Sequence, residues 1–205
     1  MSQQATTVYI VRHGETDYNA RGIIQGYLDI PLNSKGQEQA VSLAKRLVGG
    51  HPIDQIFSSD LLRAAGTASI IADALDLSVT SREDLREIHL GSWEGKGWPD
   101  ILAEDPGTRE RYFENWWLFD EHGGESRKVA WQRISQALDE IISENFGQKI
   151  LLVAHGAIIR LMIQRVIHCQ KVRAPIDIDN CSLSKVVHDE NGLRLSYLND
   201  CSHLK

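Results

Sequence analysis

The stretch Val8-Tyr9-Ile10-Val11-Arg12-His13-Gly14 indicates the fold class of this chain. Its first four residues form a short, β-branched apolar run, which is typical of a strand that is buried on both faces. The same pattern returns at Ile150-Leu151-Leu152-Val153-Ala154-His155-Gly156. Two buried strands are therefore predicted to end in the same way, at a histidine that is followed by a glycine.

Segments with helical spacing of apolar residues separate the predicted strands. Ser34-Lys35-Gly36-Gln37 has the form of a capping box, ahead of a helix that ends at Gly49-Gly50. A second strand near 55–57 precedes a helix for which Asp60 is the predicted N-cap. The remaining predicted elements are a short edge strand at 77–80, helices at about 126–145 and 157–167, and a closing hairpin at 182–187 and 193–198. Strands that alternate with helices predict an α/β fold with a largely parallel sheet.

The composition is that of one ordinary globular domain. The chain has 205 residues, which suits one full-sized domain, and the predicted domain spans 1–205. Hydrophobic residues make up 42% and charged residues 24%, which excludes a disordered chain. The 22 basic and 28 acidic residues give a net charge of −6, which argues against nucleic acid or a membrane surface as partners.

Cysteine usage and the N-terminus indicate a cytoplasmic protein. The three cysteines are odd in number and form no Cys-x-x-Cys pair, which argues against a disulfide framework and a cysteine zinc site. Residues 1–7 lack the basic and apolar regions of a signal peptide. No apolar stretch approaches the length of a membrane span. A cytoplasmic location is the expectation.

Four side chains that can bind an anion are predicted to meet at one edge of the sheet. Ligands of open α/β sheets bind beyond the carboxyl ends of the strands, where parallel neighbours would bring His13 and His155 together. The glycine after each histidine would let the chain turn sharply. Arg12 adds a guanidinium, and Arg63, in the first turn of the helix after the second strand, adds another. This set predicts a site for phosphate or carboxylate, with a dianionic tetrahedral group as the best fit.

These residues resemble the motifs of the histidine phosphatase superfamily, also called the phosphoglycerate mutase-like family. The likeness covers Val8 to about Ile167 and begins with Arg12-His13-Gly14-Glu15-Thr16 and Asn19. The later segments follow in family order: Gln25-Gly26 with Asp29, Pro31-Leu32 and Gly36; Ser58 to Ala64 with Thr67-Ala68; Glu87 to Gly95; Gly123 to Ser126 with Arg133; and His155-Gly156. Five motifs in order are far more specific than Arg-His-Gly alone. The resemblance implies a three-layer sandwich whose central sheet is flanked by helices.

The resemblance also implies a role for each candidate residue. His13 would attack phosphorus and form a phosphohistidine. Arg12, Arg63 and His155 would hold the transferring phosphoryl group. With the resemblance, Glu87 is expected to protonate the leaving alkoxide and then to activate water; from the residues alone it would be a solvated carboxylate in the charged run Arg82 to Glu87. Three further residues are expected to bind the substrate or its phosphate, namely Asn19, Gln25 and the amide of Gly156.

The acid motif favours hydrolysis over the mutase reaction. Cofactor-dependent mutases of this family carry a longer insert and a Glu-Arg-x-Tyr-Gly motif, whereas Glu87-Ile88-His89-Leu90-Gly91 stands here. The chain resembles the broad-specificity bacterial phosphatases, so we expect a metal-independent phosphomonoesterase without a cofactor that acts on small phosphate esters. The alternatives are phosphoglycerate mutase activity and a dedicated phosphatase for phosphoserine or α-ribazole phosphate. A homodimer is a further expectation.

An aromatic segment is expected to cover the site. In the family, the part of the chain at about 96–125 lies over the pocket, and here it holds many aromatic residues between Trp98 and Phe119. Such a lid would favour leaving groups with an apolar body. The alternative is ordinary helix packing, since Tyr112, Trp116 and Phe119 also fit one helix face.

Two other classes of function are weaker. A metal hydrolase could use His13, His155 and a carboxylate, but no His-Glu-x-x-His run supports it. A phosphate-binding protein that lost turnover would be expected to lose the nucleophile or the acid, and this chain keeps both.

Overall fold

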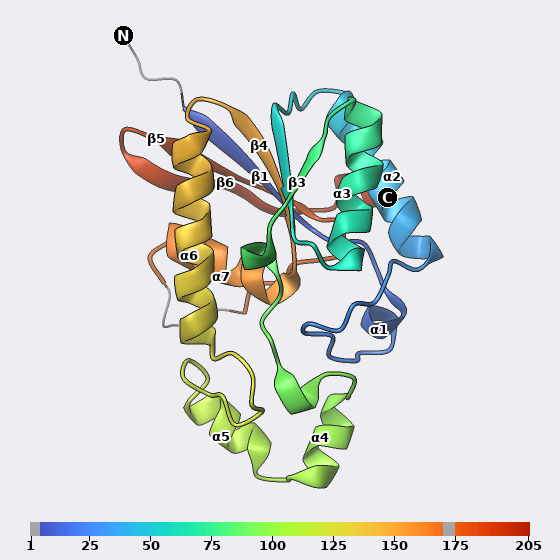
Figure 1. The fold of residues 1–205 in the computed structure, drawn as a ribbon, viewed down its shortest axis with the longest axis vertical. Coiled ribbons are helices and arrows are strands. Elements are labelled where there is room, and N and C mark those ends of the chain that lie inside the picture. The colour runs from blue at the N-terminus through green and yellow to red at the C-terminus, as the bar shows by residue number, and fades with distance from the viewer. Residues whose placement is uncertain (1–4, 170–174) are drawn as a thin grey trace.

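The computed structural model describes residues 5–169 and 175–205, and its centre is a sheet of six strands (Figure 1). The strands lie in the order β3-β2-β4-β1-β5-β6. Their bounds are β1 Thr6–Arg12, β2 Gln55–Ser58, β3 Val79–Ser81, β4 Lys149–Ala154, β5 Leu183–Asp189 and β6 Gly192–Asp200. The first four strands in this order are parallel to one another, and β5 is antiparallel to both of its neighbours, β1 and β6. The prediction of a largely parallel sheet is confirmed.

Helices cover both faces of the sheet, which makes three layers (Figure 1). On one face lie α2 (Ser34–Val48) and α3 (Leu62–Leu75), and on the other lie α6 (Arg127–Glu144) and α7 (Gly156–Val166). The short helix α1 (Asp17–Ala20) follows β1, while α4 (Trp98–Glu104) and α5 (Thr108–Glu114) lie apart from the sheet. Short 3₁₀ turns occur at Glu83–Leu85, Gly91–Trp93 and Ser202–Leu204.

The apolar runs of β1 and β4 are explained by the two hydrophobic cores that they separate. Val8 and Ile10 point into the core beneath α6 and α7, whereas Tyr9 and Val11 point into the core beneath α2 and α3. Successive side chains of a strand face opposite sides, so a strand with both faces buried has no polar alternation. The four residues of the corresponding run in β4 are also fully buried.

The N-caps predicted for α2 and α3 are not the residues that the structure shows at these positions. Asn33 caps α2, because its side chain accepts a hydrogen bond from the Gly36 N–H at 2.8 Å, and Ser34 is the first helical residue. Leu61 precedes α3 without any side-chain cap. Asp60 instead accepts a hydrogen bond from Arg86 Nε at 2.7 Å, in an ion pair with that guanidinium.

Later elements follow the prediction more closely. Ser126 caps α6 as expected, and β3 is the short edge strand. The closing hairpin is longer than predicted and turns between Asp189 and Gly192. The proposed common helix face of the aromatic segment is wrong, because α5 ends at Glu114, before Trp116 and Phe119.

Within the described ranges, no helix is long and apolar enough to cross a membrane. Residues 1–4, on which the expectation of no signal peptide partly rests, lie outside those ranges.

Candidate functional site

The ends of β1 and β4 bring two histidines together. Arg12 pairs with Ala154 as the last rung of the two strands, and the backbone N–H of His13 donates to the Ala154 carbonyl at 3.0 Å. The rings of His13 and His155 follow directly, with their centroids 5.2 Å apart. The two matching sequence patterns therefore converge because their strands are parallel neighbours.

The His13 ring is held in one tautomer. Its Nδ1 lies 2.7 Å from the Gly14 carbonyl oxygen, which can only accept, so Nδ1 carries the proton. In the neutral ring the lone pair is then on Nε2. Burial lowers the pKa of His13 well below its usual value, and the charges of Arg63 and Arg12 lower it further. His13 is therefore a neutral imidazole near pH 7, with its lone pair on Nε2.

His155 is a second buried, neutral imidazole. Burial is the main cause of its lowered pKa, and the charge of Arg63 adds to it. Neither ring nitrogen has a hydrogen-bond partner among the described residues. Buried polar atoms are nearly always satisfied, so a ring with two unsatisfied nitrogens beside His13 is suited to a polar ligand.

Two arginines supply positive charge to the same place. Arg63 is buried and donates from Nη1 to the Leu28 carbonyl and from Nη2 to the Gly26 carbonyl, both at 2.8 Å. Arg12 donates from Nη1 to the Ile178 carbonyl at 2.6 Å. In the part of the chain that the structure describes, neither forms an ion pair with a carboxylate, and each Nε is buried without a partner.

Burial depresses the pKa of both guanidiniums without discharging them. Desolvation is the largest cause in each case, and the pKa of Arg63 falls to about 10. Both groups stay cationic at neutral pH. Two backbone-held cations without a carboxylate partner indicate that this place binds an anion.

The loop after β1 is fixed by a close backbone approach. A Cβ at Gly14 would lie 2.4 Å from the Gly36 carbonyl oxygen, and one at Gly36 would lie 2.1 Å from the Glu15 carbonyl oxygen. Gly14 does not have a positive φ, so the glycine is needed for space and not for a sharp turn. The Gly14 N–H donates to Thr67 Oγ1 at 3.0 Å, which ties the loop to α3.

Asn19 and Gln25 belong to a polar cluster on this loop. Thr16 caps α1, and its Oγ1 lies 3.1 Å from Asn19 Oδ1 and 3.0 Å from Gln25 Oε1, so its single proton is donated to one of these two oxygens at a time. Asn180, from the segment before β5, also donates to Asn19 Oδ1 at 3.4 Å. These contacts occupy the side-chain oxygens of both residues, which leaves their amide nitrogens as the groups that could donate to an anion.

Glu87 reaches the N-terminus of α7. Its Oε2 accepts from the Ala157 N–H at 3.1 Å, and its Oε1 accepts from the Ile158 N–H at 3.2 Å and the Ile88 N–H at 3.0 Å. The first amides of a helix lack partners within the helix and attract negative charge. Sequence reasoning did not anticipate this contact, because amide donors leave no trace in residue identity.

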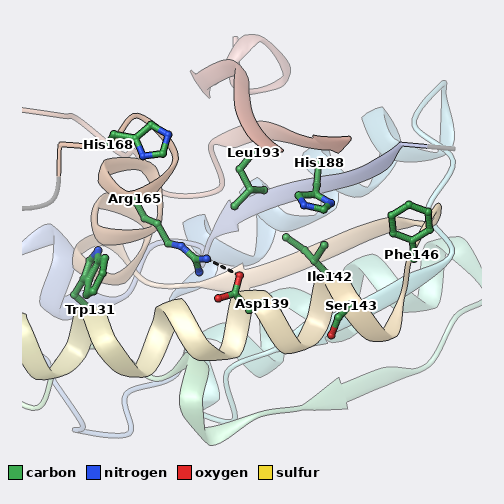
Figure 2. A pocket seen from close by; sticks show the side chains of 9 residues that line it. All are labelled: Trp131, Asp139, Ile142, Ser143, Phe146, Arg165, His168, His188 and Leu193. Carbon is green, nitrogen blue, oxygen red and sulfur yellow. Dashed lines mark hydrogen bonds and ion pairs between the residues drawn. The ribbon is translucent and has the colours of Figure 1, made fainter. Parts of the chain in front are cut away.

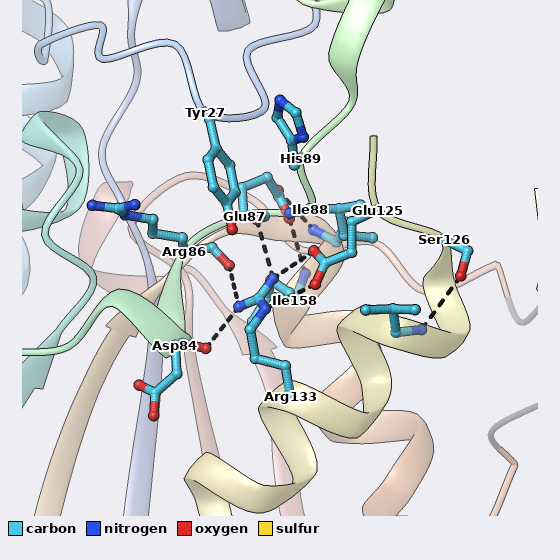
Figure 3. A network of polar contacts seen from close by, with 12 residues as sticks. Tyr27, Asp84, Arg86, Glu87, Ile88, His89, Glu125, Ser126, Arg133 and Ile158 are labelled. Atoms are coloured by element: carbon cyan, nitrogen blue, oxygen red, sulfur yellow. Dashed lines mark hydrogen bonds and ion pairs between the residues drawn. The ribbon is translucent and has the colours of Figure 1, made fainter. Parts of the chain in front are cut away.

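Arg133 fixes the segment that carries Glu87 (Figure 3). It donates from Nη1 to the Asp84 and Arg86 carbonyls, at 2.7 and 3.0 Å, and from Nη2 to the Glu87 carbonyl at 3.3 Å. The same guanidinium binds both carboxylate oxygens of Glu125, at 2.9 and 2.7 Å. In the sequence, Arg133 and Glu125 match a motif, but neither of them is assigned a role there. In the structure they hold the backbone at Glu87 in place.

A cavity of about 170 Å³ lies where these side chains meet. Six of the eight predicted site residues line it: Arg12, His13, Asn19, Gln25, Arg63 and Glu87. His155 and Gly156 do not line it. His155 packs against the His13 ring, and a Cβ on Gly156 would lie 3.4 Å from Arg12 Nε, so both border the lining residues.

A larger cavity of about 790 Å³ lies elsewhere, between α6, α7 and the closing hairpin (Figure 2). Its charged residues Arg165 and Asp139 are paired with each other at 2.5 Å. None of the predicted site residues lines it. Size alone therefore does not identify the candidate site, whereas unpaired charge at the strand ends does.

Comparison with known proteins identifies the family of this chain. Residues 8–201 match the sequence profile of the histidine phosphatase superfamily, branch 1. A phosphoglycerate mutase-like protein 4 of Arabidopsis thaliana is 39% identical over 160 residues, which cover 77% of this chain and 70% of that protein. A metal-independent phosphoserine phosphatase of the same plant is 34% identical over 168 residues, which cover 81% of this chain and 71% of that protein.

A solved structure agrees with the sequence match. The mycobacterial glucosyl-3-phosphoglycerate phosphatase superposes with a TM-score of 0.84 at 32% identity, and the alignment covers 95% of this chain and 99% of that one. The range matched to the family profile, residues 8–201, includes the loop after β1 and the helix α7 that follows β4. Because nearly the whole chain agrees in both sequence and fold, it belongs to the histidine phosphatase superfamily.

Proposed function

We propose that the protein is a metal-independent phosphomonoesterase that works through a phosphohistidine on His13. The observation that carries this proposal is the Nδ1 contact to the Gly14 carbonyl, which leaves Nε2 of a neutral ring as a nucleophile. The unpaired cations of Arg12 and Arg63 beside it would bind the phosphate of the substrate. The same cations would balance charge on the equatorial oxygens as phosphorus is transferred.

In the first step, His13 Nε2 attacks phosphorus in line with the ester oxygen. The N–P bond forms as the P–O bond to the alcohol breaks, and that electron pair leaves with the oxygen. Glu87 supplies the proton that turns the leaving alkoxide into an alcohol. His155, whose ring nitrogens have no partner among the described residues, would donate a hydrogen bond to the phosphoryl group, as would Asn19, Gln25 and the Gly156 amide.

In the second step, water attacks the phosphorus of phosphohistidine. Glu87, now a carboxylate, removes a proton from that water as the P–N bond breaks and the electron pair returns to Nε2. Orthophosphate leaves, and both His13 and Glu87 regain their starting protonation states. The position of Glu87 in the lining of the same cavity supports both halves of this role.

The names of the relatives support a phosphate ester as substrate, but they differ in the alcohol part of that ester. By name, one is a metal-independent phosphoserine phosphatase and another a glucosyl-3-phosphoglycerate phosphatase. The name of a third is phosphoglycerate mutase-like, so mutase activity is the second candidate. Among the described residues, no group of three or more His, Cys, Asp or Glu side chains is placed to hold a metal ion.

The test is phosphate release from p-nitrophenyl phosphate, phosphoserine, 3-phosphoglycerate and α-ribazole phosphate, with and without EDTA. We expect release that EDTA does not reduce. Loss of activity in EDTA would contradict metal independence. Conversion of 3-phosphoglycerate to 2-phosphoglycerate, primed by 2,3-bisphosphoglycerate and with little free phosphate, would make the protein a mutase. A homodimer, a cytoplasmic location and closure of segment 96–125 over the site stay predictions from the sequence.

A further inference from the structure

A second cavity adjoins the candidate site. Its volume is about 530 Å³, roughly three times that of the cavity at His13, and Ala157 lines both. We call it the aromatic pocket, after Trp98, Tyr112 and Trp116 on its wall. The Ala157 N–H is also the group that binds Glu87, the proposed proton donor to the leaving group. An alcohol that leaves the phosphoryl group past Ala157 would therefore enter the aromatic pocket.

Two arginines line the aromatic pocket from different helices. Arg127 is the first residue of α6, and Arg160 lies in α7. Arg127 donates to the Tyr112 hydroxyl and stacks over the rings of Tyr112 and Trp116, 5.7 and 5.4 Å from their centroids. Arg160 donates from Nε to the Ile176 carbonyl at 2.7 Å. Stacking and backbone contacts fix both guanidiniums in place.

Neither guanidinium has a carboxylate partner in the described part of the chain. Arg46, Arg86, Arg111 and Arg165 each form an ion pair with an acidic side chain, but Arg127 and Arg160 form none. The Arg127 Nε is buried and has no hydrogen-bond partner among residues 5–169 and 175–205. Asp177 also lines the pocket, so two cations face one carboxylate there. The pocket thus keeps an excess of positive charge.

The charge of Arg160 extends to the phosphate site. Burial is the main cause of the lowered pKa of Arg12, and repulsion from Arg160 is a further cause. The charges of the two guanidiniums therefore interact, although Glu87 and Asp179 also act on Arg12; Arg12 lines the cavity at His13, and Arg160 lines the aromatic pocket. A substrate with a single phosphate would use only the first of these charges.

We propose that the aromatic pocket binds the alcohol part of the substrate and that Arg127 and Arg160 bind a carboxylate on it. The substrate class is a phosphate monoester whose alcohol has a flat or apolar body and a carboxylate beyond it. Planar guanidiniums bind carboxylates with two hydrogen bonds, and the aromatic walls give the body an apolar surface. This inference rests on the proposed function for the position of the phosphoryl group.

The test uses a matched pair of phosphonates that cannot be hydrolysed. 4-Carboxybenzylphosphonate and its neutral amide, 4-carbamoylbenzylphosphonate, differ only in the group that would face the arginines. Calorimetry gives the Kd of each for the wild-type protein, for Arg160→Gln and for Arg127→Gln. Arg165→Gln is the control, since it removes the same charge from α7 at a residue that lines a different cavity.

We expect the wild type and Arg165→Gln to bind the carboxylate at least tenfold more tightly than the amide. Arg160→Gln and Arg127→Gln should bring that ratio below threefold, and Arg160→Lys should keep an intermediate ratio because it keeps the charge without the planar fork. Thermal unfolding checks that each variant is folded. Equal affinity for both phosphonates in the wild type would overturn the inference, as would a ratio that neither glutamine variant changes.

Failure of this inference is distinct from failure of the proposed function. Phosphate release from the corresponding benzyl phosphates tests turnover, whereas the phosphonates test recognition alone. Turnover without a preference for the carboxylate would contradict this inference but not the proposed phosphatase activity. A preference for the carboxylate without turnover would contradict the proposed phosphatase activity but not the assignment of the aromatic pocket as a carboxylate-binding site.

Discussion

At the scale of single residues, the Nδ1 proton of His13 decides what the candidate site can do. The Gly14 carbonyl accepts that proton, so the nitrogen with the lone pair is Nε2. Burial and two neighbouring guanidiniums hold the ring neutral. An imidazolium would have no lone pair to attack phosphorus, so the arginines that would bind the substrate also keep the nucleophile in its reactive form.

His13→Ala should reduce phosphate release by at least about 10³-fold, the order expected for loss of a nucleophile. The fold should survive, because the substitution removes one side chain at a strand end and relieves the burial of a polar ring. Phosphate release from p-nitrophenyl phosphate and thermal unfolding are the two measurements. Activity near the wild-type level in a folded variant would refute the role of His13.

Glu87→Gln should damage alkyl phosphates far more than aryl phosphates. An alkoxide leaving group needs a proton, whereas p-nitrophenolate leaves without one. Glutamine has a single acceptor oxygen for three backbone N–H groups, so some loss on both substrates is expected from misplacement alone. The informative quantity is therefore the ratio of kcat/KM for benzyl phosphate to that for p-nitrophenyl phosphate. An unchanged ratio would contradict the acid role.

At the scale of elements, α6 fixes the segment that carries Glu87. Arg133 donates to three backbone carbonyls, those of Asp84, Arg86 and Glu87, and is itself held by Glu125 (Figure 3). Both members of this ion pair are largely buried, with 20% and 11% of their side chains exposed. Such a pair is destabilising to break from one side, because the remaining charge keeps its burial without its partner.

Arg133→Lys should lower stability and should also change substrate selectivity in the same direction as Glu87→Gln. Lysine keeps the charge but cannot reach Glu125 and three carbonyls at once, so the Glu87 carboxylate should lose its fixed position. We expect alkyl phosphates to lose more kcat than aryl phosphates. A purely structural role would lower both equally, and that outcome would contradict positioning through Glu87.

Strands that are buried on both faces could be predicted from the sequence, whereas the contacts that decide the helix N-termini could not. β1 and β4 could be predicted because both faces of each strand are buried, which leaves an apolar run before each histidine. The cap of α2 was wrong by one residue, since Asn33 and Ser34 can both cap a helix. Aspartate is a residue type that often caps helices, but Asp60 forms an ion pair with Arg86, which is distant in sequence, and does not cap α3.

At the scale of the whole molecule, two neutral histidines in one core make stability depend on pH. Unfolded histidine takes up a proton as pH falls through about 6.5. Folded His13 and His155 resist protonation until much lower pH, because burial and the arginines lower the pKa of each. The unfolded state then binds more protons than the folded state, so stability is full above about pH 6.5 and is lost as pH falls below it.

Between pH 7.5 and 5.5 this effect should lower the unfolding free energy by about 1.4 kcal/mol per histidine, or about 3 kcal/mol for both. The double variant His13→Asn/His155→Asn should lose that much less over the same range. Urea unfolding at the two pH values measures both proteins. Equal losses in the two proteins would contradict the assignment of two buried neutral rings.

Only those residues of the candidate site that belong to a sequence motif or follow a predicted strand could be predicted from the sequence. The convergence of His13 and His155 follows from parallel strands, and Arg63 follows from its place in the first turn of α3. Arg127 and Arg160 carry no comparable signal. They meet in the aromatic pocket only because α6 and α7 pack together, and nothing in either local sequence indicates that neither has a carboxylate partner within the described residues.

The most direct test of the central claim is the stereochemistry at phosphorus. A substrate made chiral with sulfur and one oxygen isotope is hydrolysed in water that carries a second isotope, and the configuration of the released thiophosphate is determined. Two in-line displacements, first by His13 and then by water, predict net retention. Net inversion would show a single direct attack by water and would contradict a phosphohistidine intermediate.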